Sequence, residues 1–126
     1  MDASPNATEA IIAIVNDDEA ILDALQLLLV VSGWEARTYK TGEAFVDDLS
    51  EYKPGCLIID SHLQGLSGAD VARTLSTRYS DIPIIGTTAR PGSRLANDLV
   101  SASADVMLTK PVSAEHILSK VQAVMS

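Results

Sequence analysis

Cations, aromatic residues and cysteines are all scarce in this chain of 126 residues. Nine Lys and Arg residues stand against seventeen Asp and Glu residues, which gives a formal net charge of −8 at pH 7. Because binding to phosphate backbones needs clustered cations, this balance predicts no direct nucleic-acid binding. The single cysteine, Cys56, excludes an intramolecular disulfide and is compatible with a reducing cytoplasm, which is the location we expect.

Long apolar runs are also missing. The longest candidate, residues 25–31, is far shorter than the roughly 18 residues of a membrane-spanning helix, so we expect no membrane insertion. Residues 1–9 lack a basic segment followed by an apolar stretch, which argues against a signal peptide. Apolar residues nevertheless make up 47% of the chain, enough for the core of one compact domain.

The order of apolar and polar residues predicts the fold class. Residues 1–10 are polar and aperiodic, so we expect a flexible N-terminal extension before a domain over residues 11–126. Short apolar runs then alternate with stretches of helical spacing. We expect five strands, each followed by a helix, at residues 11–15, 36–39, 56–59, 82–88 and 106–108. This alternation favours an α/β flavodoxin-like (βα)5 fold, with a parallel sheet of order 2-1-3-4-5 between two helix layers.

Polar side chains follow the strands at the edge where such sheets bind ligands. They are Asn16, Asp17 and Asp18 after the first strand, Asp60 after the third, Thr87 and Thr88 at the end of the fourth, and Lys110 after the fifth. Two carboxylates about 4 Å apart repel by roughly 1 kcal/mol in water and about 4 kcal/mol at an effective dielectric of 20. One lysine offsets only one of them, and Mg²⁺ would satisfy the remainder. A carboxylate beside a metal and a lysine is a suitable nucleophile for a phosphoryl group, so we predict an aspartyl-phosphate site.

Several motifs occur in a family-like order: the acidic cluster after the first strand, LIIDSHLQGLSG over residues 57–68, IPIIGTTA over residues 82–89, and Lys110-Pro111. Over residues 11–124 the chain thereby resembles the receiver domain of response regulators, the CheY-like family. The resemblance implies a two-component phosphorelay in which a sensor histidine kinase or a histidine phosphotransfer protein phosphorylates Asp60. It further implies an unidentified output protein or domain, and it allows a homodimer. Such a domain assists its own phosphotransfer and dephosphorylation without being a conventional enzyme.

The resemblance also implies a metal site of oxygen ligands. Asp17 and Asp60 would bind Mg²⁺, with Mn²⁺ as an alternative, and the backbone carbonyl of His62 would complete the protein ligands. Asn16 would act by hydrogen bonding behind these ligands rather than bind the metal.

Around the phosphate, the resemblance implies that Thr88 and Ala89 form the switch segment, with the Thr88 hydroxyl bound to the phosphoryl oxygens. Lys110 would pair with Asp60 or its phosphate, and the peptide bond before Pro111 would be cis. His62 and Arg90 would flank the mouth and modulate the lifetime of the phosphate. We interpret Thr87 only as a residue that favours a strand.

Several positions depart from the family pattern, among them Ser103 in place of a helix-ending glycine and Val112 in place of an aromatic residue after the proline. Asn16 replaces the first acid when Ile21 and Leu25 are matched to the family's apolar positions; a shift of one residue would instead pair Asp17 with Asp18. Gln64 replaces a common loop proline. Met107 replaces the aromatic switch residue, so the usual coupling of a threonine to an aromatic ring cannot operate unchanged.

Two alternative functions remain open. A non-phosphorylated pseudo-receiver that serves as a scaffold is favoured by Asn16 and Met107. A haloacid-dehalogenase-like phosphatase also uses an aspartyl phosphate, but its nucleophile follows the first strand and has a second acid two residues later. Asp60 meets neither condition, so this alternative is the weaker one.

Overall fold

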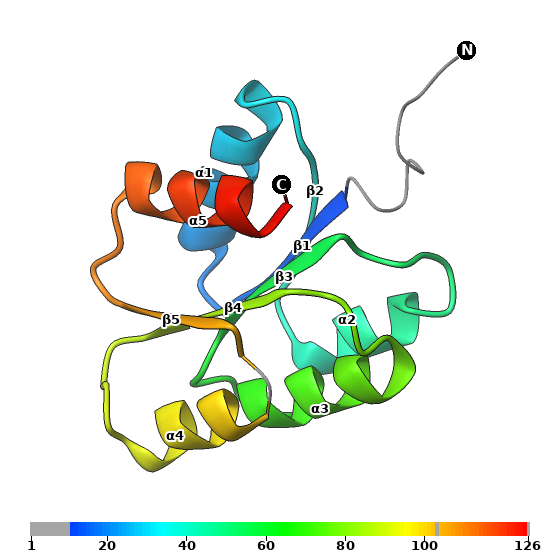
Figure 1. The fold of residues 1–126 in the computed structure, drawn as a ribbon, viewed down its shortest axis with the longest axis vertical. Coiled ribbons are helices and arrows are strands. Elements are labelled where there is room, and N and C mark those ends of the chain that lie inside the picture. Colours follow the sequence, from blue (N-terminus) through cyan, green and yellow to red (C-terminus); the bar gives the residue numbers. More distant parts are fainter. Residues whose placement is uncertain (1–10, 103, 126) are drawn as a thin grey trace.

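The computed structural model describes residues 11–102 and 104–125, so the expected extension over residues 1–10 lies outside the described residues. Within them, five parallel strands form one sheet in the order β2-β1-β3-β4-β5, as predicted (Figure 1). The strands are β1 (Ile11–Val15), β2 (Glu35–Tyr39), β3 (Cys56–Asp60), β4 (Ile84–Thr88) and β5 (Val106–Thr109). The helices are α1 (Glu19–Val31), α2 (Gly42–Asp48), α3 (Gly68–Arg78), α4 (Arg94–Ser101) and α5 (Ala114–Met125).

Helices cover both faces of the sheet, with α1 and α5 on one side and α2, α3 and α4 on the other (Figure 1). We name these the α1–α5 face and the α2–α4 face. Because side chains alternate along a strand, β1 sends Ile12 and Ile14 to the first face and Ile11, Ala13 and Val15 to the second. Two apolar cores therefore form back to back, which explains why the central strands are apolar without alternation.

Local signals in the sequence account for the element boundaries. The β4 strand begins at Ile84 rather than residue 82, because Pro83 has no N–H for a ladder hydrogen bond. The Ser67 hydroxyl accepts from the backbone N–H of Asp70, and the Asp70 carboxylate accepts from the backbone N–H of Ser67. This capping box fixes the start of α3 directly after the loop that follows β3.

No helix among the described residues has the length and apolar character needed to span a bilayer.

Candidate functional site

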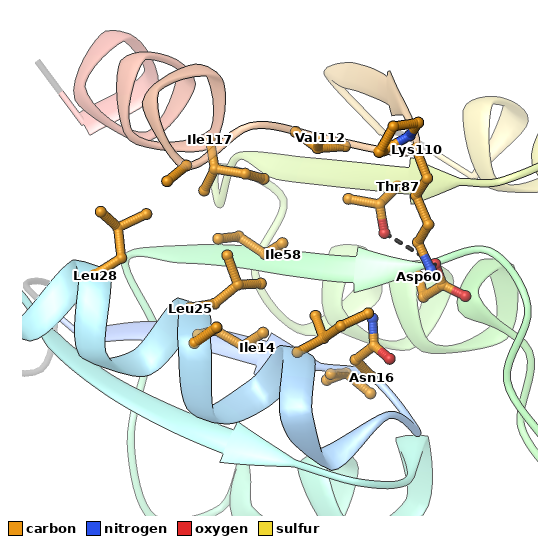
Figure 2. Close-up of a pocket in the computed structure, with 15 residues that line it drawn as sticks. Ile14, Asn16, Leu25, Leu28, Ile58, Asp60, Thr87, Lys110, Val112 and Ile117 are labelled. Carbon is orange, nitrogen blue, oxygen red and sulfur yellow. Dashed lines mark hydrogen bonds and ion pairs between the residues drawn. The ribbon is translucent and has the colours of Figure 1, made fainter.

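Asp60, the last residue of β3, lies at the centre of a cluster of hydrogen-bond donors. Its carboxylate is buried, and its Oδ1 is 2.7 Å from the Lys110 Nζ. The Thr87 hydroxyl donates to the same oxygen at 3.0 Å, and the backbone N–H of His62 donates to Oδ2 at 3.1 Å. Figure 2 shows Lys110 and Thr87 converging on Asp60. Charge-assisted hydrogen bonds of this kind belong to the stronger class, so the carboxylate is held in a defined orientation.

The parallel register brings the site residues together from the ends of four strands, β1, β3, β4 and β5. Val15 pairs with Ile59, so Asn16 follows beside Asp60, and Asp60 itself pairs with Thr87. On the next strand Thr88 pairs with Thr109, and the backbone N–H of Lys110 donates to the Thr88 carbonyl at 2.7 Å. The peptide bond between Lys110 and Pro111 is cis. The predicted meeting of an aspartate and a lysine at one sheet edge is thus present.

Thr87, rather than Thr88, contacts the Asp60 carboxylate. Thr87 and Asp60 are paired residues whose side chains lie on the α1–α5 face, whereas Thr88 faces the opposite side of the sheet. The buried Thr88 hydroxyl instead accepts from the backbone N–H of Arg90 at 3.1 Å. Our interpretation of Thr87 as a residue that only favours a strand is therefore wrong. The role of Thr88 toward a phosphoryl group stays a prediction.

The two acids after β1 have different surroundings. The Asp18 carboxylate caps α1 by accepting from the backbone N–H groups of Ala20 and Ile21, and its own N–H donates to Asn16 Oδ1 at 2.9 Å. The Asp17 side chain is exposed and makes no hydrogen bond or ion pair within the described part of the chain. Because the cap occupies Asp18 while Asp17 stays available, the geometry favours the register that places Asn16 and Asp17 at the family's acidic pair.

The metal ligands predicted from the sequence are all oxygen atoms, and their chemistry is that of a site for a hard divalent cation. No group of three or more His, Cys, Asp or Glu side chains within residues 11–102 and 104–125 could hold a metal ion. The binding of a metal by the carboxylates of Asp17 and Asp60 and the His62 carbonyl stays a prediction, and these groups are a small set of oxygen donors. Such a set suits Mg²⁺, which retains several of its waters when bound to protein.

The loop after Asp60 is tightly held at its two ends. The buried Ser61 hydroxyl lies 2.7 Å from His62 Nδ1, which orients the half-buried imidazole. At the far end, a Cβ on Gly68 would collide with the carbonyl oxygen of Asp60, so the first turn of α3 rests directly on the backbone of the site. Only glycine allows this approach. Gln64, which replaces the family's proline, is exposed.

The remaining predicted switch residues lie on or near the α2–α4 face. Met107 is half-buried, and its sulfur packs so closely on Gly86 that a Cβ there would collide with it and crowd Leu99. Ala89 and Arg90 are exposed in the segment after β4. Met107 therefore lies inward against the sheet, in space that the absence of a side chain at Gly86 provides.

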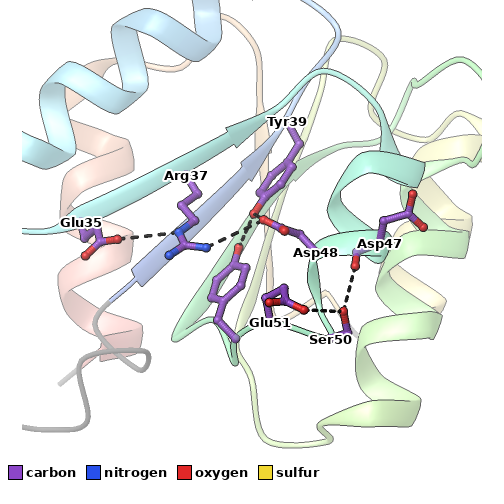
Figure 3. Close-up of polar contacts among 8 residues, drawn as sticks. Glu35, Arg37, Tyr39, Asp47, Asp48, Ser50 and Glu51 are labelled. Carbon is purple, nitrogen blue, oxygen red and sulfur yellow. Dashed lines mark hydrogen bonds and ion pairs between the residues drawn. The ribbon is translucent and has the colours of Figure 1, made fainter.

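A second polar cluster holds the edge strand β2 against α2, and it was not anticipated from the sequence (Figure 3). The Tyr39 hydroxyl donates to Asp48 Oδ2 at 2.7 Å and lies 2.8 Å from the Tyr52 hydroxyl. The Arg37 guanidinium lies over the Tyr52 ring, 4.4 Å from its centroid. Burial is the main cause that raises the pKa of both tyrosines above the ordinary value. The backbone carbonyl of Tyr39 accepts from the backbone N–H of Asn16 at 3.0 Å, so β2 and the segment after β1 stay paired beside the site.

A five-stranded flavodoxin-like sheet whose central strand ends in a buried aspartate, paired with a half-buried lysine that follows the last strand, is the arrangement of a CheY-like domain. The chain belongs to the response regulator receiver domain family, whose model matches residues 12–122. Receiver domains are the part of response regulators that operates in two-component systems.

Individual relatives agree with this assignment. The response regulator protein TmoT of Ectopseudomonas mendocina is 32% identical over 120 residues, which cover 95% of this chain and 54% of TmoT. The sensory transduction protein RegX3 of Mycobacterium tuberculosis is 32% identical over 114 residues, which cover 90% of this chain and 50% of RegX3. The chain thus spans about half the length of these relatives.

The fold also matches solved structures. A CheY-like receiver domain protein from Methanospirillum hungatei superimposes with a TM-score of 0.86 at 23% identity, over 91% of this chain and 92% of that one. At that identity the likeness concerns the fold alone.

Proposed function

We propose that Asp60 accepts a phosphoryl group from a sensor histidine kinase or a histidine phosphotransfer protein, and that this modification switches protein–protein interactions. The observation that carries the proposal is the buried Asp60 carboxylate bonded at one oxygen by both Lys110 and Thr87. Membership of the receiver family supports the same role. The cytoplasm is the compartment in which we place this exchange.

In the proposed transfer, an Asp60 carboxylate oxygen attacks the phosphorus of a phosphohistidine. A P–O bond forms to Asp60 and the P–N bond breaks, with its electron pair returning to the histidine ring. Lys110 and Thr87 are placed to neutralise and hydrogen-bond the oxygens of the group in transit. Attack of water on the acyl phosphate later returns the carboxylate and releases inorganic phosphate. The domain assists both steps without being a conventional enzyme.

Asp17, Asp60 and the His62 carbonyl would hold Mg²⁺, or Mn²⁺ in its place. When bound, the metal supplies positive charge against the phosphoryl oxygens. Asn16 contributes no charge of its own. Because this position lacks one negative charge of the family pattern, we expect weaker metal binding and slower phosphotransfer, but not their loss.

The proposed switch uses the charge that phosphorylation adds, about −1.5 to −2 at pH 7. Thr88 and Ala89 would shift toward that charge and alter the surface formed by α4, β5 and α5, where an output domain or a second copy would bind. Met107 already packs inward on Gly86, so the shift cannot rely on an aromatic ring moving into that space.

Intact-mass measurement after incubation with acetyl phosphate and Mg²⁺ tests the proposal. We expect the chain to gain the mass of one phosphoryl group, and Asp60→Asn to gain none. Asp47→Asn, which changes an exposed aspartate of α2, is the matched control and should behave like the unmodified chain. If the unmodified chain gains no phosphoryl group and binds no beryllofluoride, the pseudo-receiver scaffold is the better account of this domain.

A further inference from the structure

A cleft opens on the α1–α5 face and ends at the phosphoacceptor site (Figure 2). Its volume is about 570 Å³, which lies within the usual range for small-molecule sites. Ile14 and Ile58 form its floor on the sheet, Leu25 and Leu28 form the wall on α1, and Val112 and Ile117 form the opposite wall. Asn16, Asp60, Thr87 and Lys110 lie at one end. The cleft is therefore aliphatic along its length and polar at a single end.

Small residues stand on both walls of the cleft. Ala24 of α1 and Ala114 of α5 both line it, so neither position fills the cleft with a large side chain. As a result Leu25 and Leu28 stay only half-buried, although they belong to the helix face that packs toward the sheet. An occupant that covers this aliphatic surface would be stabilised by the apolar area it removes from water.

The polar end selects the head group of such an occupant. Asp60 and Lys110 already neutralise each other, so a carboxylate head would be repelled by Asp60 and an ammonium head by Lys110. Lys110 retains N–H donors beyond the one directed at Asp60, and the Thr87 oxygen can still accept a hydrogen bond while its own proton goes to Asp60. A hydroxyl group can both accept from Lys110 and donate to Thr87.

We propose that this cleft binds an uncharged aliphatic alcohol, with its chain between α1 and α5 and its hydroxyl group beside Thr87 and Lys110. The inference goes beyond the proposed phosphorylation, and it needs neither Mg²⁺ nor a phosphodonor. Its test can therefore fail while Asp60 is still phosphorylated, or succeed in a scaffold that is never phosphorylated.

The test is a methyl NMR titration of the full chain with octanol, without metal or phosphodonor. We expect saturable shift changes at the methyl groups of Leu25, Leu28 and Ile117, and none at Leu75 and Leu99 on the α2–α4 face. Octanoate and octylamine, which share the chain but carry a charged head, should bind at least about tenfold more weakly. Equal binding of octanoate and octanol would overturn the assignment of the head group, and with it the proposal.

Two variants that fill the cleft complete the experiment. Ala24→Leu and Ala114→Leu, from opposite walls, should each abolish the octanol-dependent shifts. Ala123→Leu makes the same change at an exposed position of α5 outside the cleft and should leave them intact. The proposal is overturned if octanol causes no shifts up to its solubility limit, if shifts appear equally on both faces, or if both filling variants bind octanol as well as the unmodified chain does.

Discussion

The two faces of the sheet are built from the same strands yet are closed in different ways. On the α2–α4 face, large side chains such as Phe45, Leu75 and Leu99 are fully buried, and the Tyr39–Tyr52 pair seals the edge. On the α1–α5 face, Leu25 and Leu28 stay half-buried beside an open cleft. Strands with apolar side chains on both faces of the sheet thus give two hydrophobic cores, but the two cores need not be packed equally tightly. The volume of the residues on the covering helices decides how tightly each face closes.

The largest expected difference between the faces comes from matched leucine truncations. Leu75→Ala on α3 should lower the free energy of unfolding by about 3–5 kcal/mol, because it leaves a cavity in a filled core. Leu28→Ala on α1 should cost at most about half of that, because water already reaches its side chain. Urea unfolding of both variants measures the difference. Equal losses would mean that the cleft closes in solution.

Adding atoms instead of removing them should give an intermediate effect. Gly86→Ala on the α2–α4 face should cost about 1–3 kcal/mol, because its new methyl group collides with Met107 and crowds Leu99. Ala24→Leu on the other face adds more atoms but enters open space, so it should cost nothing or stabilise the fold slightly. Thermal unfolding, with the Met107 methyl resonance as a local probe, compares the two. A neutral Gly86→Ala would contradict the close packing of Met107.

The last expected difference concerns alkaline pH, because each face of the sheet buries a titratable group. Burial raises the pKa of Tyr39 on the α2–α4 face, and on the α1–α5 face it raises the pKa of the Cys56 thiol from 9.0 to about 12. The unfolded chain therefore loses these protons first. Each group therefore contributes its full share to the free energy of unfolding below its pKa in the unfolded chain. This contribution falls as the pH rises above that pKa.

Unfolding by urea at a series of pH values between about 8 and 11 measures this decline. Cys56→Ala should flatten it from about pH 9 upward, and Tyr39→Phe only from about pH 10. At neutral pH, Tyr39→Phe should cost about 1 kcal/mol through the lost hydrogen bond to Asp48. An unchanged slope in either variant would show that the corresponding group is not protected from titration in the fold.

Much of the site could be predicted from the sequence because parallel strands share one carboxyl edge. That rule places Asp60 and Lys110 together, although fifty residues separate them, and the capping box of Ser67 and Asp70 follows from local spacing alone. The contact of Thr87 with Asp60 was not predicted, because the register between β3 and β4 was not considered. Asp60 ends a strand whose register pairs it with Thr87, so the alternation of side chains assigns Thr87 and Thr88 to opposite faces.

Other features depend on packing that periodicity does not encode. The contact between Tyr39 and Asp48 joins two elements across the edge of the sheet, and nothing in the spacing of either residue signals the other. The cleft is lined in part by the small residues Ala24 and Ala114, which an apolar pattern does not distinguish from larger ones. Patterns identify which faces are buried, whereas side-chain volumes and contacts determine how completely they are filled.

The two oxygens of the Asp60 carboxylate differ in the freedom of their partners. Oδ1 is held by two side chains that can rotate, those of Lys110 and Thr87, while Oδ2 is held by a backbone N–H that cannot move without its loop. Phosphorylation at Oδ1 would release two mobile groups to follow the incoming oxygens, and phosphorylation at Oδ2 would strain the loop instead. Oδ1 thus has partners that can adapt, and Oδ2 has a rigid one. The oxygen that reacts therefore determines whether two side chains or the loop after β3 must move.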